Sequence, residues 1–370
     1  MGNLASSYSA LGKDAEAEKL KTIVLEKRTK LLGEDHPQTL LSMANLATSY
    51  SALGKDAEAE KLERIVLEKR TRLLGEDHPD TLITMANLAF SYSALGKEAE
   101  AEKLKTIVLE KRTSLLGEDH PDTLASMSHL ARSYSALGKD AEAEKLERIV
   151  LEKRKRFLGE DHPDTLVSMA NLATSYSALG KDAEAEKLRR IVLEKHTRLL
   201  GEDHPSTLSS MTNLATSYST LGKDAKAEKL ERIVLEKCTK LLGEDHPQTL
   251  LSMANLAASY AALGKDAEAE KLERIVLEKR TRLSGEDHPS TLLSMGNLAA
   301  SYSALGKDAE AEKLERIVLN KRKMLLGEDH PDTLLAMNNL ACTYDEMGQS
   351  EKAQALWDEW ERLRVARLSI

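Results

Sequence analysis

One pentapeptide, GEDHP, occurs eight times in this 370-residue chain, and successive copies always begin 42 residues apart. The first copy begins at Gly33 and the last at Gly327. All eight prolines lie in these pentapeptides, and the nine tyrosines, Tyr8 through Tyr344, keep the same 42-residue step. A constant period of this length indicates a solenoid, in which each repeated unit buries its apolar face only against its neighbours. The chain has few other ways to fold.

Each unit contains the pattern of two helices. The stretch PQTLLSMANLATSYSALG has apolar residues at steps of three or four, which is typical of one helix face: Leu40, Met43, Leu46, Ala47, Tyr50 and Leu53. Pro37 suits the first turn of this helix, and Gly54 suits its end. Asp56 is the expected N-cap of a second helix, which ends at Gly75. The sequence therefore predicts an all-α solenoid of helix-turn-helix units.

The pattern N-L-A-x-x-Y-x-x-x-G-K-x-x-x-A, which spans Asn45 to Ala59, resembles the tetratricopeptide repeat. The period of 42 with D-H-P between helix pairs is similar to the repeats of kinesin light chains and to the C-terminal sensor arrays of fungal and bacterial NLR-like (STAND) ATPases. The resemblance covers residues 1–370 and implies a right-handed superhelix whose first helices line a concave, ligand-binding groove. One departure is Asp56, because such repeats often carry an aromatic residue after G-K.

The repeats divide the chain into three parts of a single solenoid. We expect a truncated first repeat over residues 1–36, seven full repeats over 37–330 and a divergent capping repeat over 331–370. In the last repeat Trp360 takes the position of Val66, and Trp357 that of Glu63. We expect the two indole rings to close the end of the core; the alternative is a docking site for another subunit.

The first residues, MGNLASSYSALGKD, contain the glycine and serine of an N-myristoylation motif. Residues 295–308 read MGNLAASYSALGKD, so the repeat by itself explains the match. We therefore interpret residue 1 as a cut within a first helix, with more protein upstream in the parent. The exposed apolar edge of that incomplete repeat could support end-to-end self-association.

Composition narrows the classes of function. The net charge is −8 and no block of like charge stands out, so neither nucleic acid nor a membrane surface is an expected partner. No apolar run approaches the ~18 residues of a membrane span. The two cysteines, Cys238 and Cys342, form no metal or redox spacing and suggest a reducing compartment, the cytoplasm.

Candidates for chemistry are explained by the repetition. Each Glu-Asp-His triplet offers one imidazole beside two carboxylates, whereas zinc requires about four convergent ligands, so we interpret the triplets as turns and caps. G-K is never followed by Ser or Thr and lacks the upstream glycine of a phosphate loop. No serine has His and Asp partners at one place. We therefore expect that the chain is not an enzyme and that it binds neither a metal nor a cofactor.

Differences between copies concentrate on one face of the first helix. Three columns vary most: the first holds Leu41, Ile83, Ala125, Val167, Ser209, Leu251, Leu293 and Leu335; the second holds Ala44, Ala86, Ser128, Ala170, Thr212, Ala254, Gly296 and Asn338; the third holds Thr48, Phe90, Arg132, Thr174, Thr216, Ala258, Ala300 and Cys342. Steps of three and four place these columns together. The variable columns contain one charge, Arg132, and one aromatic ring, Phe90.

A column of amides lies beside them: Asn45, Asn87, Asn171, Asn213, Asn255, Asn297 and Asn339, interrupted once by His129. Each such amide offers a donor and an acceptor to an extended peptide backbone. The resemblance to repeats of the kinesin light chain type implies this role, because those repeats use similar asparagines. The alternative is that they brace neighbouring helices. The predicted peptide-binding set is this column with Phe90, Arg132, Thr174 and Thr216, and the neighbouring His129, Arg132 and Phe90 are the expected specificity spot.

We therefore expect a non-catalytic module that recognises a protein or peptide segment in its groove. The resemblance implies the sensing or scaffolding part of a larger NLR-like signalling protein, and the absence of coiled-coil heptads argues against a motor adaptor. The alternative is a structural spacer or self-assembly element with an empty groove. An engineered consensus-like array is a further alternative, against which the irregular last repeat argues.

Overall fold

The structure, a computed structural model, describes Tyr8 and residues 14–368, and the regular elements in this part of the chain are α-helices. The shorter first helices of the repeats are α3 (Pro37–Ala52), α5 (Pro79–Ala94), α7 (Pro121–Ala136), α9 (Pro163–Ala178), α11 (Pro205–Thr220), α13 (Pro247–Ala262), α15 (Pro289–Ala304) and α17 (Pro331–Glu346). The second helices are α2 (Asp14–Leu32), α4 (Asp56–Leu74), α6 (Glu98–Leu116), α8 (Asp140–Leu158), α10 (Asp182–Leu200), α12 (Asp224–Leu242), α14 (Asp266–Ser284), α16 (Asp308–Leu326) and α18 (Ser350–Leu368).

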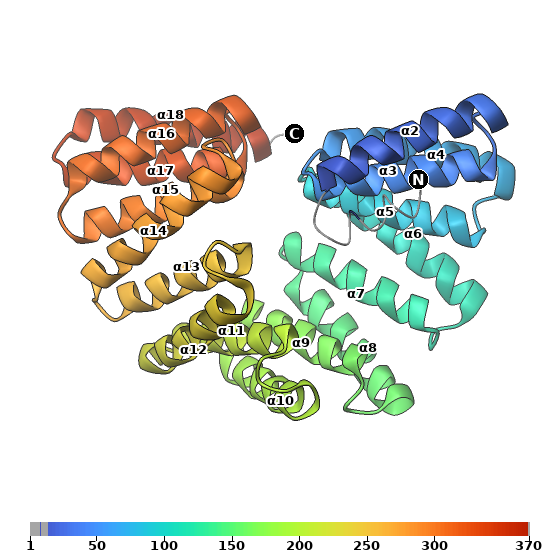
Figure 1. The fold of residues 1–370 in the computed structure, drawn as a ribbon, viewed down its shortest axis with the longest axis horizontal. Coiled ribbons are helices and arrows are strands. Elements are labelled where there is room, and N and C mark those ends of the chain that lie inside the picture. Colours follow the sequence, from blue (N-terminus) through green and yellow to red (C-terminus); the bar gives the residue numbers. More distant parts are fainter. Residues whose placement is uncertain (1–7, 9–13, 369–370) are drawn as a thin grey trace. The chain divides into compact units, whose positions relative to one another are not determined.

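The chain forms two compact units, Met1–Leu188 and Arg189–Ile370, each described here by itself. Within each unit, consecutive helices pack against one another and alternate in direction (Figure 1). The all-α solenoid and its 42-residue helix-pair period are thus confirmed. The division into a truncated, seven full and a capping repeat stays a prediction. The N-terminal motif and the expected self-association edge lie in residues 1–7 and 9–13, outside the described residues.

The histidine and proline of GEDHP start each first helix. His162 is the N-cap of α9, and its Nδ1 accepts a hydrogen bond from the backbone N–H of Asp164 at 3.2 Å. Pro163 follows at the first helical position, where a missing N–H costs nothing. The same cap occurs at His36, His78, His120, His204, His246, His288 and His330. The histidines therefore have the capping role that the sequence suggests.

Gly54 and Lys55 turn the chain from α3 into α4. Gly54 has a φ of +70°, and the Lys55 N–H bonds the Tyr50 carbonyl at 2.8 Å, which ends α3 in a Schellman-type turn. The Lys55 ammonium lies 5.5 Å from the centre of the Tyr50 ring and 2.7 Å from a carboxylate oxygen of Glu18 in the preceding repeat. The G-K pair is therefore structural.

The expected N-cap at Asp56 is wrong. The residue in the cap position of α4 is Lys55, whose side chain makes no capping hydrogen bond, and Asp56 already lies in the first helical turn. The Lys55 backbone carbonyl accepts the N–H of Ala59 at 3.1 Å. Asp56 instead places negative charge near the positive end of the helix dipole.

Small side chains allow the two helices of a repeat to approach closely. Ala47 on α3 and Ala59 on α4 are both fully buried, together with Leu46 and Val66. The equivalent positions are buried in later repeats, for example at Ala173, Ala185, Leu172 and Val192. Because each apolar stripe is covered by the neighbouring helices, the core runs along each unit and has no single centre.

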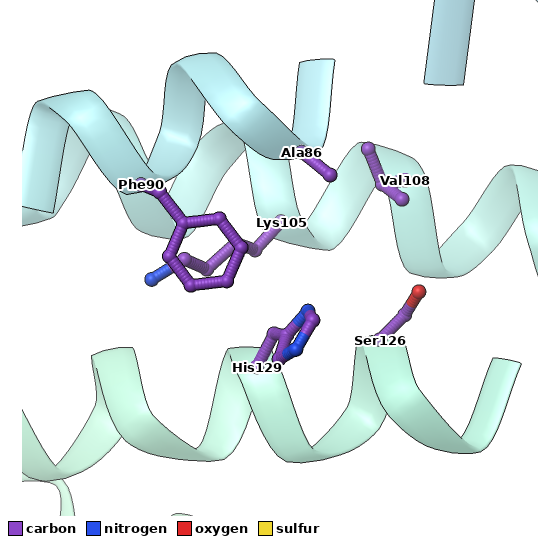
Figure 2. A pocket seen from close by; sticks show the side chains of 6 residues that line it. All are labelled: Ala86, Phe90, Lys105, Val108, Ser126 and His129. Atoms are coloured by element: carbon purple, nitrogen blue, oxygen red, sulfur yellow. The ribbon is translucent and has the colours of Figure 1, made fainter. Parts of the chain in front are cut away.

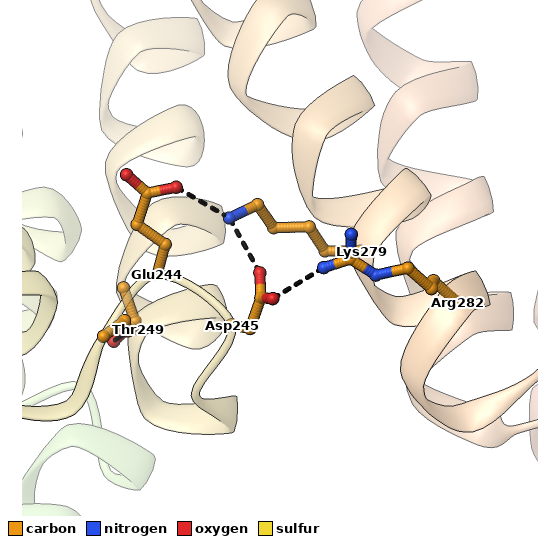
Figure 3. Close-up of polar contacts among 6 residues, drawn as sticks. Glu244, Asp245, Thr249, Lys279 and Arg282 are labelled. Carbon is orange, nitrogen blue, oxygen red and sulfur yellow. Dashed lines mark hydrogen bonds and ion pairs between the residues drawn. The ribbon is translucent and has the colours of Figure 1, made fainter.

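Ion pairs between repeats use the Glu and Asp of GEDHP. Lys279 on α14 pairs with Glu244 at 3.1 Å and with Asp245 at 2.9 Å, and Arg282 pairs with Asp245 at 2.6 Å (Figure 3). Comparable pairs join Lys69, Lys111, Lys153, Lys237 and Lys321 to the preceding loops. Each exposed pair contributes only ~0.2–1 kcal/mol, so these contacts orient neighbouring repeats and add little stability.

The last helix covers the end of the apolar core in the second unit. Trp360 and Leu363 on α18 pack with Met337 and Leu340 of α17. The side chain of Trp357 is half-buried on the same helix. The core-closing role expected of the rings is thus seen for Trp360.

Removal of one internal repeat should leave a folded protein. Deletion of residues 247–288 removes α13 and α14 and joins two identical loop sequences. Because the repeats contact mainly their neighbours, we expect the helical content per residue to stay unchanged and the melting transition to stay cooperative. Circular dichroism measures both. Loss of helical structure across the remaining chain would contradict a nearest-neighbour solenoid.

Candidate ligand-binding face

The residues predicted to bind a ligand lie on the side of the first helices that faces away from the core. We call this surface the first-helix face; it consists of the asparagine column and the three variable columns. Asn45, Asn213 and Asn339 are exposed, and Asn87, His129, Asn171, Asn255 and Asn297 are half-buried. Every residue of the third variable column is exposed, including Phe90, Arg132, Thr174 and Thr216. These side chains are accessible within each unit.

Most amides of the asparagine column are free of protein partners. Within the described residues, Asn45, Asn87, Asn213, Asn255, Asn297 and Asn339 form no side-chain hydrogen bond. The exception is Asn171, whose Nδ2 donates to Glu147 Oε1 at 3.3 Å. The bracing role thus occurs in one repeat, and elsewhere each amide keeps both its donor and its acceptor for other molecules.

The threonines of the third variable column are already satisfied as donors. Thr174 Oγ1 donates to the carbonyl of Ala170 at 3.2 Å, and Thr216 Oγ1 donates to that of Thr212 at 3.1 Å. Thr48 bonds in the same way to Ala44. These side chains therefore offer only an acceptor and a methyl group, and directional recognition falls to the neighbouring amides.

Phe90, His129 and Arg132 come together, as the sequence predicts. The structure adds Lys105, which lies beside Phe90 and His129 in Figure 2. The Phe90 and His129 rings meet edge to face, with centres 4.9 Å apart. The Arg132 guanidinium lies 5.4 Å and the Lys105 ammonium 5.6 Å from the centre of the Phe90 ring. Both distances suit cation–π attraction. We call these four residues the Phe90 cluster.

The Phe90 cluster is a packed surface that contains two cations, Arg132 and Lys105, and Lys105 pairs with Glu98 at 3.6 Å. The cavity that it borders measures only about 10 Å³, which is too small for a ligand side chain. Lys105 is buried, and its ammonium donates to Ser133 Oγ at 2.6 Å and to Ser93 Oγ at 3.0 Å. Burial, together with Arg132 and Lys105, lowers the pKa of His129 to about 4. His129 is therefore neutral at pH 7.

Lys105 belongs to a row of charged residues between successive repeats. We call it the charged row; its members are Lys21, Glu63, Lys105, Glu147, Arg189, Glu231, Glu273 and Glu315. Several bond a hydroxyl in the next repeat: Lys21 donates to Ser49 at 2.6 Å, Ser91 donates to Glu63 at 2.7 Å and Arg189 donates to Ser217 at 2.6 Å. Glu147 contacts Ser128 and Asn171. The row therefore lies directly beneath the first-helix face.

Burial makes several of these carboxyl groups weak acids. The pKa of Glu63, Glu147 and Glu231 rises to about 7, mainly because the ionised form loses its hydration. Ser91 partly offsets this at Glu63, and Ser128 and Asn171 do so at Glu147. Glu231 has no such aid, since its buried Oε2 has no hydrogen-bond partner. It is thus the least compensated member of the charged row.

Comparison with known proteins identifies the repeat. One model described as a tetratricopeptide repeat matches residues 1–68 and 87–152, and a second with the same description matches residues 165–206, 207–248, 249–290 and 291–332. The chain belongs to the tetratricopeptide repeat family. A search of curated protein sequences gives no significant match.

Several solved structures of tetratricopeptide repeats are similar to this chain, and the share of the chain that they cover differs. Nearly identical TPR-like repeats of a protein assigned as a kinesin light chain, from Podosopora anserina, are 32% identical with a TM-score of 0.51, over 56% of this chain and 99% of that one. A STAND protein with a tetratricopeptide repeat sensor, from Pyrococcus horikoshii, is 15% identical with a TM-score of 0.54, over 92% and 52%. A Rap protein complexed with competence and sporulation factor is 12% identical with a TM-score of 0.56, over 94% and 98%.

These likenesses confirm the family resemblance read from the repeat pattern. The STAND protein and the Rap protein are less than 25% identical to this chain, so their likeness shows the fold alone. Within the described residues of this tetratricopeptide repeat protein, no group of three or more His, Cys, Asp or Glu side chains could hold a metal ion. None of the helices in that part of the chain has an apolar stretch long enough to cross a bilayer.

Sequence reasoning missed Lys105 as a member of the site. The replacement of Glu63 by Lys105 at the equivalent position is visible in the sequence, but it lies on the second helix, away from the variable columns. Two unusual residues in adjacent repeats could have indicated it. Lys105 reverses the charge of Glu63, and Arg132 is the one charged residue in the third variable column. The tetratricopeptide stack brings these positions together across the repeat boundary.

Neutralising Glu231 should remove a pH-dependent loss of stability. Because its folded pKa of about 7 exceeds the ordinary value of 4.5, the folded state binds more protons between these pH values, and stability falls as pH rises through them. Glu231→Gln should match the parent near pH 5 and exceed it at pH 8 by about 1–3 kcal/mol. Urea denaturation at both pH values measures the difference. Glu236→Gln, an exposed change on the same helix, is the control; an equal effect of both variants would contradict the argument.

Proposed function

We propose that this tetratricopeptide repeat protein is a non-catalytic recognition module whose first-helix face binds an extended polypeptide segment. The observation that carries the proposal is the asparagine column, in which six amides have no protein partner within the described residues; Asn171 and His129 are the exceptions. An extended peptide presents alternating backbone donors and acceptors, which an amide can satisfy in both senses. Each such neutral hydrogen bond contributes about 1 kcal/mol, so affinity comes from several repeats together.

The wider role follows from the relatives. The STAND protein carries its tetratricopeptide repeats as a sensor, and we propose that this chain is likewise the sensing or scaffolding part of a larger NLR-like signalling protein. The Rap protein of similar fold is complexed with a factor, which agrees with ligand binding by such arrays. Both cysteines are free thiols, which suits the cytoplasm as its compartment. A spacer with an empty first-helix face is the alternative.

The Phe90 cluster is the proposed determinant of ligand choice in the first unit. Within the described residues, the guanidinium of Arg132 forms no ion pair or hydrogen bond; it lies over the Phe90 ring and interacts electrostatically with Glu147. Its donors are therefore free for a ligand, while the buried Lys105 supports the ring from below. Elsewhere the third variable column presents threonine, alanine or cysteine. Selectivity should therefore concentrate at this cluster.

Removing three amides should abolish binding without unfolding the protein. In the second unit, Asn213, Asn255 and Asn297 are changed together to Ala, and peptides selected on the parent from a random-peptide display library serve as ligands. We expect binding to fall by roughly 100-fold, as the loss of several bonds of about 1 kcal/mol each implies. Calorimetric titration measures this, and thermal melting should match the parent.

The control is Asn320→Ala, which removes an exposed amide from the second helix α16. It should leave affinity unchanged. Full affinity in a folded triple variant would refute the amide column as the binding element. A triple variant that melts far below the parent would show instead that the asparagines brace the helices.

Restoring the common residues at the Phe90 cluster should change which peptides bind. Phe90→Thr with Arg132→Thr gives the first unit the side chains found at Thr48 and Thr174. Both original side chains are exposed, so we expect little effect on stability. Sequencing of library clones selected on the double variant should show a different consensus from the parent. Phe157→Leu, which removes an exposed ring from α8, is the control; an unchanged consensus on the double variant would contradict the proposed role.

A further inference from the structure

A cavity in the second unit opens where one repeat departs from the others. It measures about 250 Å³ and lies between the start of α11, the end of α12 and the loop that leads into α13. Its apolar walls are Leu208, Leu241 and Leu242, and its other lining residues include Ser209, Cys238 and Gln248. Leu241 and Leu242 are each more than two-fifths exposed, so the cavity is reached from the surface.

The equivalent cavity in the first unit shows what is missing. Three periods earlier, Leu82, Ile83, Arg112, Leu115 and Leu116 line a cavity of only about 70 Å³. The leucines are the same, but Ile83 becomes Ser209, Arg112 becomes Cys238 and Asp122 becomes Gln248. The first two replacements make a side chain smaller, and they fall in the same repeat. The two smaller side chains, at Ser209 and Cys238, both line the larger cavity.

An arginine normally occupies this place. Arg112 Nη1 donates to the carbonyl of Asp122 at 3.3 Å and to Ser126 Oγ at 2.9 Å. Arg28, Arg70, Arg154 and Arg280 make the same pair of bonds. The guanidinium thus joins the end of one repeat to the start of the next, while its methylene stem lies among the leucines.

Cys238 leaves the acceptors of that arginine in place. Ser252 Oγ donates to the Gln248 carbonyl at 3.0 Å and lies 3.6 Å from Cys238 Sγ. In the repeats that hold Arg28, Arg70, Arg112, Arg154 and Arg280, the equivalent carbonyl also accepts a hydrogen bond from the guanidinium. Asp203 lines the same cavity, where its carboxylate pairs with the Lys237 ammonium. The cavity therefore has apolar walls and acceptors suited to a planar cation.

We propose that this cavity is a subsite that binds an arginine side chain of the polypeptide partner. It rests on the proposed function in one respect, because the arginine belongs to the segment that the first-helix face binds. The methylene stem packs against Leu208, Leu241 and Leu242, and the guanidinium donates to the Gln248 carbonyl, as Arg112 donates to the equivalent carbonyl of Asp122. Ser209 belongs to the first variable column, so the subsite continues the first-helix face.

The test needs no partner protein. The isotope-labelled full chain is titrated with N-acetyl-arginine methylamide, and in parallel with the leucine and lysine analogues, while backbone NMR shifts are followed. We expect saturable shifts confined to residues 203–252 and an affinity order in which arginine exceeds lysine and leucine. Cys238→Arg refills the cavity with the residue that most other repeats have at this position. It should weaken binding by about 10- to 100-fold, the value of a hydrogen bond to a charged group.

Two further variants keep the outcome decisive. Arg112→Cys with Ile83→Ser opens the equivalent cavity in the first unit and should create a second set of shifts over residues 77–126. Ser209→Leu narrows the original cavity without touching Cys238, and it should weaken binding even if Cys238→Arg fails to fold. Absence of shifts at 203–252, equal binding of the leucine analogue, or undiminished binding to the refilled variants would overturn the proposal. None of these results depends on the asparagine column, so the two proposals fail separately.

Discussion

The packing of each helix pair against the next is the interaction on which the rest of the structure depends. A single pair cannot cover its own apolar stripe, so Leu46, Ala47, Ala59 and Val66 are buried only when neighbours are stacked on them. Close approach requires alanine at the helix crossing, and it fixes where each loop and ion pair lies. The repeated histidine caps, glycine turns and lysine bridges all serve this one arrangement.

Stacking buries each first helix against the neighbouring helices and leaves the first-helix face accessible. On that side the repeated element is an amide without a partner, and the variable elements are the side chains beside it. The Phe90 cluster adds bulk and charge, whereas Ser209 and Cys238 remove them and open a cavity.

The charged row shows that the array is not built for stability alone. Burial raises the pKa of Glu63, Glu147 and Glu231 to about 7, which means that ionisation near neutral pH works against the folded state. Apolar residues at these positions would avoid this cost. Glu63 accepts a hydrogen bond from Ser91, and Glu147 accepts hydrogen bonds from Ser128 and Asn171, which belong to the first-helix face. The row therefore couples the core of one repeat to the surface of the next.

The sequence by itself determined the helix pairs, their 42-residue period, the family and the position of the amide column, because these follow from spacing within one repeat. It also located Phe90, His129 and Arg132 near one another. Only the tertiary structure showed that Lys105 lies beneath Phe90, that Asn171 alone bonds Glu147 and that Cys238 leaves a cavity. The N-cap of α4 was predicted wrongly, at Asp56, because the Gly54 turn shifts the helix start by one residue. Contacts between different helices join residues that are far apart in the chain. The periodicity of one helix shows which residues share a face, but it does not show which side chains of other helices contact that face.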